Sequence, residues 1–313
     1  MPTERTANLI AMLLGMPVSA GFVDLAADRL ADNLSAAGFD EAMRAALLAE
    51  PVLGADESPV NVLHADLDPD TGEPIPGAAQ AMAIRTPDDR LVWLRPLVSR
   101  YAEAVLEPLA GFTGYLIVDG YRAYQRLLAT IKGVQQCCQH VIRRCRQVAK
   151  LGPGSLQNWT DDVRAVLHEA HDAVTAAKAA GQTALDPDLL AGLRARYDEA
   201  VAFGQAHNRH RDWDDGNHPG YTLACWLADY ADQVWLFATA FDVDWTNNAS
   251  ERTIKVPKRH QAVSGYWHTQ GTLGRFCRIR SYLTSADNHG VEAKDAIHAA
   301  LTGDPWLPSI ATA

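Results

Sequence analysis

The stretch VLGADESPVNVL at 52–63 marks the point where the chain changes from helix-forming to sheet-forming sequence. The fifty residues before it are rich in Ala and Leu at helical spacing, with interruptions at Gly15 to Pro17 and at Gly38. The stretch is a short run rich in β-branched and large apolar residues that ends before a cluster of turn-forming residues, which is typical of a β-strand. We therefore expect a small helical leader, followed by the first strand of a sheet.

Two further runs of large apolar and β-branched residues follow, AQAMAIRT at 79–86 and LVWLRPLV at 91–98. Because turn-forming residues separate these short runs, three antiparallel strands are the simplest interpretation. A helical pattern then covers 99–110.

The second part of the sheet is predicted from the order of the next elements. The apolar run GYLIV at 114–118 ends abruptly at Asp119-Gly120, and VQQCCQHV at 134–141 has the composition of another strand. A helical pattern over 121–130 separates the two runs. Strand-helix-strand alternation after a meander predicts a mixed α/β fold.

The following residues are predicted to be mainly helical. Residues 155–208 have the pattern of two long helices split by Gly181 to Pro187, and 209–220 form a polar loop. One more helix is expected over 221–240.

Composition narrows the class of protein. The chain has 313 residues, 48% of them apolar and 21% charged, which fits a globular protein and excludes a disordered or fibrous one. No stretch of about 18 apolar residues is present, so we expect no membrane association. The five cysteines are an odd number, which argues against a disulfide framework. These features predict a cytoplasmic protein with reduced thiols.

The net charge of -10 conceals two basic segments. Residues 120–160 hold seven Lys or Arg and no acid, and residues 251–280 hold seven more against the single acid Glu251. Such segments can form a face that neutralises phosphates, as in nucleic-acid-binding proteins. For either segment alone, the alternative that the charges merely solvate a helix stays open.

Two aspartates lie in or next to predicted strands. Asp56 is inside the first strand, and Asp119 follows the strand at 114–118 directly. A buried carboxylate is costly without a partner, and a divalent cation such as Mg²⁺ is a suitable one. The alternatives are that Asp56 is a turn residue and that Asp119 caps the helix after it.

Glu251 lies in the unusual segment DVDWTNNASERTIK at 242–255. It is a candidate metal ligand, but Asn248 and Glu251 also have the spacing of a helix capping box. Pro257 is expected to stop or kink the helix that begins here.

A strand Asp, a second strand-end Asp and a distant helical Glu, with basic segments after the last two, are the arrangement of a ribonuclease-H-like phosphoryl-transfer site. The chain resembles the transposases of the insertion sequence 66 family, which carry a DDE catalytic domain. The matching stretches are VLGADESPVNVL, GYLIVDGYRAY, CCQHVIRRC at 137–145 and WTNNASERTIKVPKRHQAVSGYW at 245–267. NNASER followed by KVPKRH is the most specific of them.

The resemblance implies roles for individual residues. Asp56, Asp119 and Glu251 match the acids that bind the catalytic metal ions, Mg²⁺ or Mn²⁺ and two in number. Arg143 and Arg144 match part of a Cys-His-Arg-Arg motif of the family. The residues expected to contact DNA phosphates are Arg143, Arg144, Arg252, Lys255, Lys258 and Arg259.

The resemblance also implies the architecture and the reaction. It implies a ribonuclease-H-like sheet with flanking helices, in which residues 51–150 and 236–305 form the catalytic core. A helical insertion before the catalytic Glu covers 151–235, and 1–50 are the helical leader. The implied reaction is two-metal phosphoryl transfer, in which water frees a 3′-hydroxyl at the transposon end and that hydroxyl attacks target DNA.

The implied partners are DNA at the transposon ends and at the target, a second copy of the chain on DNA, and element-encoded accessory proteins. The location would be the cytoplasm, in association with the nucleoid. Ser58 stands where the family usually has Thr, and the usual N-terminal DNA-recognition module is not expected in this chain. Two alternatives therefore stay open: a catalytically silent DNA-binding remnant, and a ribonuclease-H-like nuclease without strand transfer.

Several other groups are expected to be structural. A zinc site at Cys137, Cys138, His140 and Cys145 is disfavoured because a second ligand pair at regular spacing is absent. Trp245 and Trp267, which flank the Glu251 segment, could stack on an unpaired base but are expected to lie in the core.

Overall fold

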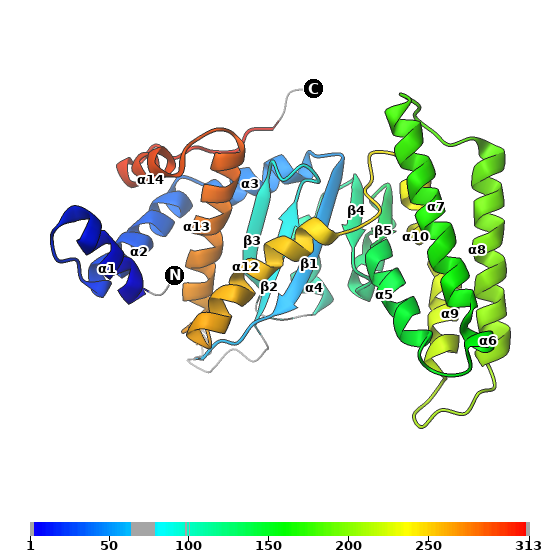
Figure 1. Ribbon diagram of the computed structural model, residues 1–313. Helices are drawn as coiled ribbons and strands as arrows, with labels where there is room; N and C mark the ends of the chain where they lie inside the picture. Colours follow the sequence, from blue (N-terminus) through cyan, green and yellow to red (C-terminus); the bar gives the residue numbers. More distant parts are fainter. Residues whose placement is uncertain (1–2, 64–78, 98, 100, 311–313) are drawn as a thin grey trace. The chain divides into compact units, whose positions relative to one another are not determined.

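The structure is a computed structural model that describes residues 3–63, 79–97, 99 and 101–310. The chain divides into two compact units. Unit 1 comprises Met1–Gly114, Arg122–Ile131 and Ala249–Ala313, and unit 2 comprises Tyr115–Tyr121 and Lys132–Asn248. Both units contain strands and helices (Figure 1), so the predicted mixed α/β class is confirmed.

Unit 1 begins with three helices, α1 (Thr3–Leu14), α2 (Ala20–Ala36) and α3 (Phe39–Leu48). Gly15 and Gly38, at the breaks between them, have φ of +67° and +75°, which favours glycine over any other residue. Ser19 caps α2 by accepting a hydrogen bond from the amide of Phe22. The helical character predicted for the first fifty residues is confirmed.

Three antiparallel strands follow, β1 (Val52–Pro59), β2 (Gln80–Arg85) and β3 (Val92–Leu97). Asp56 of β1 lies opposite Ala83, and Ala83 lies opposite Leu94 of β3. The predicted meander is therefore confirmed. Val98, the last residue of the third predicted run, lies outside the described residues.

The remaining helices of unit 1 include α12 (Asn248–Ser264), α13 (Gln270–Asn288) and α14 (Ala293–Thr302). In Figure 1, α13 lies along β3, and Ala83 and Leu94 join an apolar cluster with Ile254 of α12 and Leu273 of α13. The hydroxyl oxygens of Ser281 and Ser285 accept hydrogen bonds from the amides of Leu94 at 2.7 Å and Val92 at 3.0 Å. The helix thereby satisfies amides of an edge strand, which would otherwise be open to another chain.

We expect Ser281→Ala to destabilise the protein by about 1–3 kcal/mol, because the buried amide of Leu94 loses its acceptor. Urea unfolding of the purified variant measures this change. Ser35→Ala, at an exposed position of α2, is the control and should change the free energy of unfolding by less than about 0.5 kcal/mol. Equal stabilities of the two variants would show that Ser281 does not support β3.

Unit 1 also contains short helices, α4 (Ala102–Leu106), η1 (Glu107–Leu109) and η2 (Arg122–Leu127). The helix predicted over 121–130 is wrong in type and length, because η2 is a short 3₁₀-helix. The two residues that η2 buries, Ala123 and Tyr124, are neighbours in sequence. A longer α-helix would bury positions three and four apart instead.

Unit 2 contains a parallel pair of strands, β4 (Tyr115–Val118) and β5 (Gly133–Gln136), and the helix α5 (Cys138–Val148). The strand predicted over 134–141 ends at Gln136. The residues after it are helical because Cys138, Val141 and Cys145, spaced three and four apart, form one buried face of α5.

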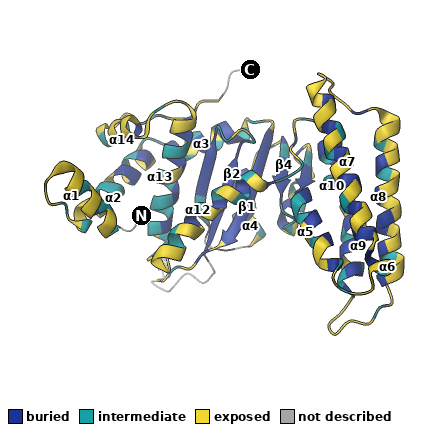
Figure 2. Ribbon diagram, viewed as in Figure 1, coloured by how far each residue is buried: buried dark blue, intermediate teal, exposed yellow. Residues whose placement is uncertain are grey.

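The other helices of unit 2 are α6 (Gly154–Gln157), α7 (Trp159–Ala179), α8 (Pro187–Asn208), α9 (Pro219–Asp229), α10 (Ala231–Val234) and α11 (Leu236–Thr239). The two predicted long helices, α7 and α8, are confirmed, and each is buried along one side and exposed along the other (Figure 2). The single helix predicted over 221–240 is wrong, because the backbone leaves the α-helical conformation at Tyr230 and Trp235. The breaks let Val234, Trp235 and Phe237 all be buried.

Within the described residues, no helix has both the length and the apolar character that crossing a bilayer requires.

Candidate functional site

Two carboxylates occupy successive positions of β1. Asp56 and Glu57 have only 5% and 8% of their surface exposed, and their carboxylate oxygens lie within 4.8 Å of one another. Because Asp56 lies inside the strand, opposite Ala83, the interpretation of it as a turn residue is wrong. Two carboxylates this close repel each other when both carry charge, and a bound cation would relieve that repulsion.

Glu57 is part of this arrangement, although it was not among the residues predicted to form the site. The hydroxyl of Tyr124, on η2, donates a 2.8 Å hydrogen bond to Oε2 of Glu57. A Glu beside a strand Asp has no distinguishing spacing in the sequence. What distinguishes Glu57 is that both it and Asp56 are buried, and this burial is known only from the fold.

Asp119 follows β4, in a bend closed by Gly120 at φ +104°. The side chain of Asp119 makes no hydrogen bond to any described residue, and the next helix, η2, begins only at Arg122. Asp119 is therefore not the cap of that helix, and the capping alternative is wrong. Its carboxylate is partly exposed at the end of a strand.

Glu251 is the fourth residue of α12, since the helix begins at Asn248. A capping box needs Asn248 before the helix and Glu251 third within it, so that arrangement is not formed around Asn248. The Glu251 side chain is 16% exposed, and its Oε2 lies 3.8 Å from Nζ of Lys255, one turn further on. Glu251 therefore lies next to a positive charge on a mostly buried part of the helix.

The segment leading into α12 is fixed within unit 2. The amide of Asn247 donates to Sγ of Cys137 at 3.2 Å, and the amide of Cys138 donates to the carbonyl of Trp245 at 2.9 Å. These bonds join the Asn-Asn motif to the start of α5. They give Cys137 a structural role that the sequence did not reveal.

Pro257 was predicted to stop or kink α12, and it does not stop the helix, which continues to Ser264. Pro257 cannot donate a hydrogen bond to the carbonyl one turn before it. Ile254 and Pro257 are both buried, and His260 stacks on Trp267 at 4.4 Å between ring centroids. These contacts hold the last part of the helix in place.

Four of the predicted DNA-binding residues lie on α12, and all four are exposed: Arg252, Lys255, Lys258 and Arg259. Residues three, four and seven apart share a face of a helix. Arg252, Lys255 and Arg259 therefore project from one side of α12.

The other two predicted DNA-binding residues lie on α5 and differ in environment. Arg143 is exposed, with Nη1 3.4 Å from Nε2 of His140. The guanidinium of Arg144 instead lies over the ring of Trp226, 4.5 Å from its centroid, and burial lowers the pKa of Arg144. Arg144 thus packs α5 against α9, whereas Arg143 is accessible.

Two more arginines of the second basic segment are neutralised within unit 1. Arg275 forms ion pairs with Asp24, at 2.7 Å, and with Asp28, and Arg278 pairs with Asp40 at 2.6 Å. The three aspartates belong to the acidic leader helices. Ion pairs between the second basic segment and the acidic leader therefore hold α13 to α2 and α3.

The cysteines and the tryptophans are largely structural. Burial raises the pKa of Cys145 to about 12 and that of Cys138 well above its usual value, so both thiols are neutral core groups. Trp267 is 4% exposed, and Trp245 stacks on His171 at 4.1 Å. The prediction of a core position is confirmed for Trp267, whereas Trp245 is half-buried and packs against the apolar core of unit 2.

The candidate acids fit a divalent cation. Asp56, Asp119 and Glu251 offer only carboxylate oxygens, which are the ligands that Mg²⁺ and Mn²⁺ prefer. The adjacent buried carboxylates of Asp56 and Glu57 favour a positive ion at β1 for the same electrostatic reason.

Comparison with known proteins assigns the family. The family model described as Transposase IS66 family matches residues 1–273, a range that includes all three candidate acids. No curated protein and no solved structure matches the chain. The mixed α/β architecture, with three antiparallel and two parallel strands, is consistent with the ribonuclease-H-like fold of such enzymes. The chain therefore belongs to the IS66 family of DDE transposases.

Proposed function

We propose that the protein is a metal-dependent DNA transposase that cleaves DNA at the ends of its element and joins the freed 3′-hydroxyl to target DNA. The observation that carries the proposal is the family match, which covers Asp56, Asp119 and Glu251 together. The proposal extends to the domain organisation, with a core of 51–150 and 236–305, an insertion at 151–235 and a leader at 1–50.

Asp56, Asp119 and Glu251 would hold Mg²⁺ or Mn²⁺, with two ions as the expected number. When bound, such ions neutralise charge on the attacking and leaving oxygens of an in-line phosphoryl displacement. The hydroxyl of Tyr124 donates a hydrogen bond to the carboxylate of Glu57, the neighbour of Asp56, and would hold that side chain in place before DNA binds. Preorganised charge of this kind is the main contribution a protein makes to phosphoryl transfer.

Exposed basic side chains would bind the DNA backbone. Arg143 on α5 and Arg252, Lys255, Lys258 and Arg259 on α12 are accessible, and Arg144 would act mainly by holding α5 in place. The partners would be the transposon ends and target DNA, together with a second copy of the chain and element-encoded accessory proteins. The protein would act in the cytoplasm, on nucleoid DNA.

Plasmid nicking tests the proposal. The plasmid carries the inverted repeats read from the DNA that flanks the gene, and the purified chain is added with Mg²⁺ or with EDTA. We expect nicks at the repeats that require Mg²⁺ and are absent from a plasmid without repeats. Binding to the repeats without any nicking would instead support a catalytically silent remnant.

Single charge changes test the basic surfaces. We expect Arg143→Gln and Lys258→Gln each to weaken binding to duplex DNA of any sequence. Each should also lower the slope of log affinity against log salt by about 0.9, because one phosphate contact is lost. Fluorescence anisotropy at several salt concentrations measures both quantities. Lys294→Gln, at an exposed position of α14, is the control and should leave the slope unchanged; unchanged slopes in the test variants would remove those residues from the DNA surface.

A further inference from the structure

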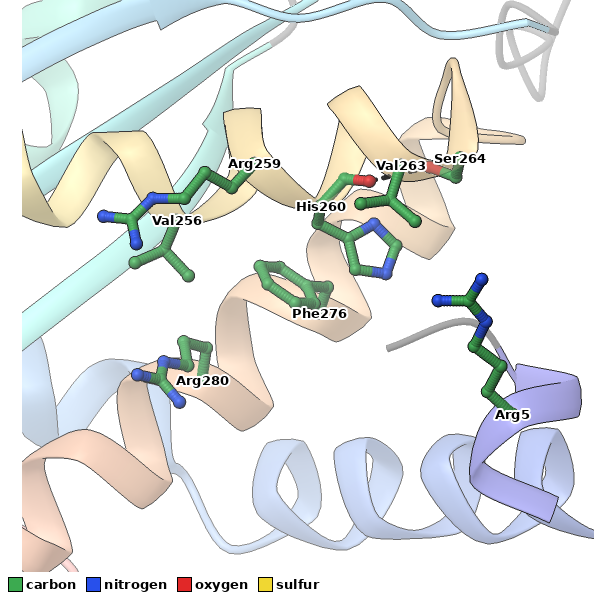
Figure 3. Close-up of a pocket in the computed structure, with 8 residues that line it drawn as sticks. All are labelled: Arg5, Val256, Arg259, His260, Val263, Ser264, Phe276 and Arg280. Carbon is green, nitrogen blue, oxygen red and sulfur yellow. Dashed lines mark hydrogen bonds between the residues drawn. The ribbon is translucent and has the colours of Figure 1, made fainter. Parts of the chain in front are cut away.

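A hollow of about 490 Å³ in unit 1 combines positive charge with an apolar wall. It lies between α1, α12 and α13 and has the size of a small-molecule site. Figure 3 shows Arg259 and Arg280 at one side of the hollow, Arg5 at the other, and the ring of Phe276 between them. Charge therefore lies at both ends and apolar surface in the middle.

Within the described residues, the arginines of this hollow have no carboxylate partner. Arg5, Arg259 and Arg280 are exposed, and none of them forms an ion pair with a carboxylate of the described residues. This differs from Arg275 on the same helix α13, whose two aspartate partners lie on α2. Three guanidinium groups around one hollow repel one another, and an anion would relieve that repulsion.

The middle of the hollow suits a flat apolar group. Val256 and Val263 of α12 line it together with Phe276, and the ring of His260 lies beside Phe276 at 5.0 Å between centroids. Burial lowers the pKa of His260, so its ring is neutral. Rings and branched side chains of this kind form the surface on which an unstacked base rests.

A second hollow extends the first one along α12. It is lined by Arg252, Thr253 and Asn288, and it shares Val256 and Arg280 with the first. The two hollows are thus parts of one groove, which we call the α12/α13 groove. Asp89, which lines the groove, has its Oδ1 2.8 Å from Nη2 of Arg85.

We propose that the α12/α13 groove binds an unpaired nucleotide of DNA, with flanking phosphates on Arg5 and Arg280 and the base against Val263 and Phe276. The inference rests on the proposed function, because it takes DNA as the substrate. Charge at both ends of an apolar middle matches a base between two phosphates. A hollow of about 490 Å³ is large enough for one splayed base.

The test compares two labelled DNA duplexes, one blunt and one with an unpaired overhang, in binding measurements on the full chain with EDTA present. We expect the wild type to bind the overhang duplex more tightly. Arg5→Gln and Arg280→Gln should each remove most of that preference and lower the salt slope for the overhang by about 0.7. Val263→Ser, at a side chain 65% exposed, should weaken overhang binding without changing the salt slope.

Arg29→Gln is the matched control, because Arg29 is an exposed arginine of unit 1 that lines neither hollow. It should keep the wild-type preference. If Arg5→Gln and Arg280→Gln also keep it, the inference is overturned. Binding of a Glu-rich peptide that depends on Arg280, without any overhang preference, would likewise overturn it and assign the groove to a protein partner.

This binding measurement tests the inference separately from the proposed function, because binding of the overhang requires neither metal nor DNA cleavage. If the protein prefers overhangs through Arg5 and Arg280 but never nicks DNA, the inference about the groove stands and the proposed function is wrong. If the protein nicks DNA in Mg²⁺ while the two arginine variants bind overhangs normally, only the inference about the groove is wrong.

Discussion

Glu251→Gln is expected to reduce Mg²⁺-dependent cleavage and strand transfer by at least about 10²–10³-fold while changing stability by less than about 1 kcal/mol. Gln keeps the shape of Glu and its ability to accept a hydrogen bond, so α12 retains its packing. What it lacks is the negative charge that a metal ligand needs. The loose 3.8 Å contact with Lys255 contributes little at this exposed lysine.

The measurement is the rate of nicking at the element ends, together with thermal unfolding of the same preparation. Glu199→Gln, at an exposed position of α8, is the control and should cleave like the wild type. Asn248→Ala should also cleave at close to the wild-type rate, because Asn248 lies inside α12 and is exposed. Normal cleavage by Glu251→Gln would show that Glu251 is not a metal ligand.

Asp56→Asn is expected to abolish nicking and, at the same time, to leave the metal-free protein as stable as the wild type or more so. The substitution removes one of two buried carboxylates whose oxygens lie within 4.8 Å. The repulsion between them falls, and so does the affinity for a cation. Asp119→Asn should likewise abolish nicking.

Thermal unfolding with and without Mg²⁺ measures the second half of this prediction. Mg²⁺ at ten times its dissociation constant should stabilise the wild type by about 1.4 kcal/mol, and that increase should disappear in Asp56→Asn. A cooperative unfolding transition of Asp56→Asn without Mg²⁺ is the control, because it shows that a lost increase does not come from misfolding. An unchanged increase would remove Asp56 from the set of metal ligands.

The parts of the fold that could be predicted are those set by local pattern. Short apolar runs separated by turn-forming residues predicted β1 to β3, and β1 and β2 are buried on both faces. Helical spacing predicted α7 and α8, because each of these helices is buried along one side only. The strand-end position of Asp119 followed from the same reasoning. The resemblance in the NNASER segment predicted the family, which the family match confirms.

The parts that could not be predicted depend on contacts distant in sequence. Pro257 favours a break, yet the burial of Ile254 and the stacking of His260 on Trp267 continue α12 to Ser264. Residues 221–240 form three helices instead of one because this segment is buried on all sides. Such a segment has no periodic pattern of apolar residues from which its breaks could be predicted.

The DNA-binding surface could also be predicted only in part from the charges in the sequence. The charge count located the two basic segments. It could not distinguish Arg275 and Arg278, which pair with acids of the leader, from Arg280, which forms no ion pair with a described residue. It could also not show that Arg144 lies over Trp226. Which cations are available to DNA is decided by tertiary structure.

Analysis of the DNA ends tests the central claim most directly. Wild-type protein is incubated in Mg²⁺ with a labelled element end and a target plasmid, and the products are sequenced. The account predicts a free 3′-hydroxyl at the element end and, later, that same end joined covalently to target DNA, with neither product in EDTA. Ends that carry a 3′-phosphate, or cleavage that proceeds equally well in EDTA, would contradict it.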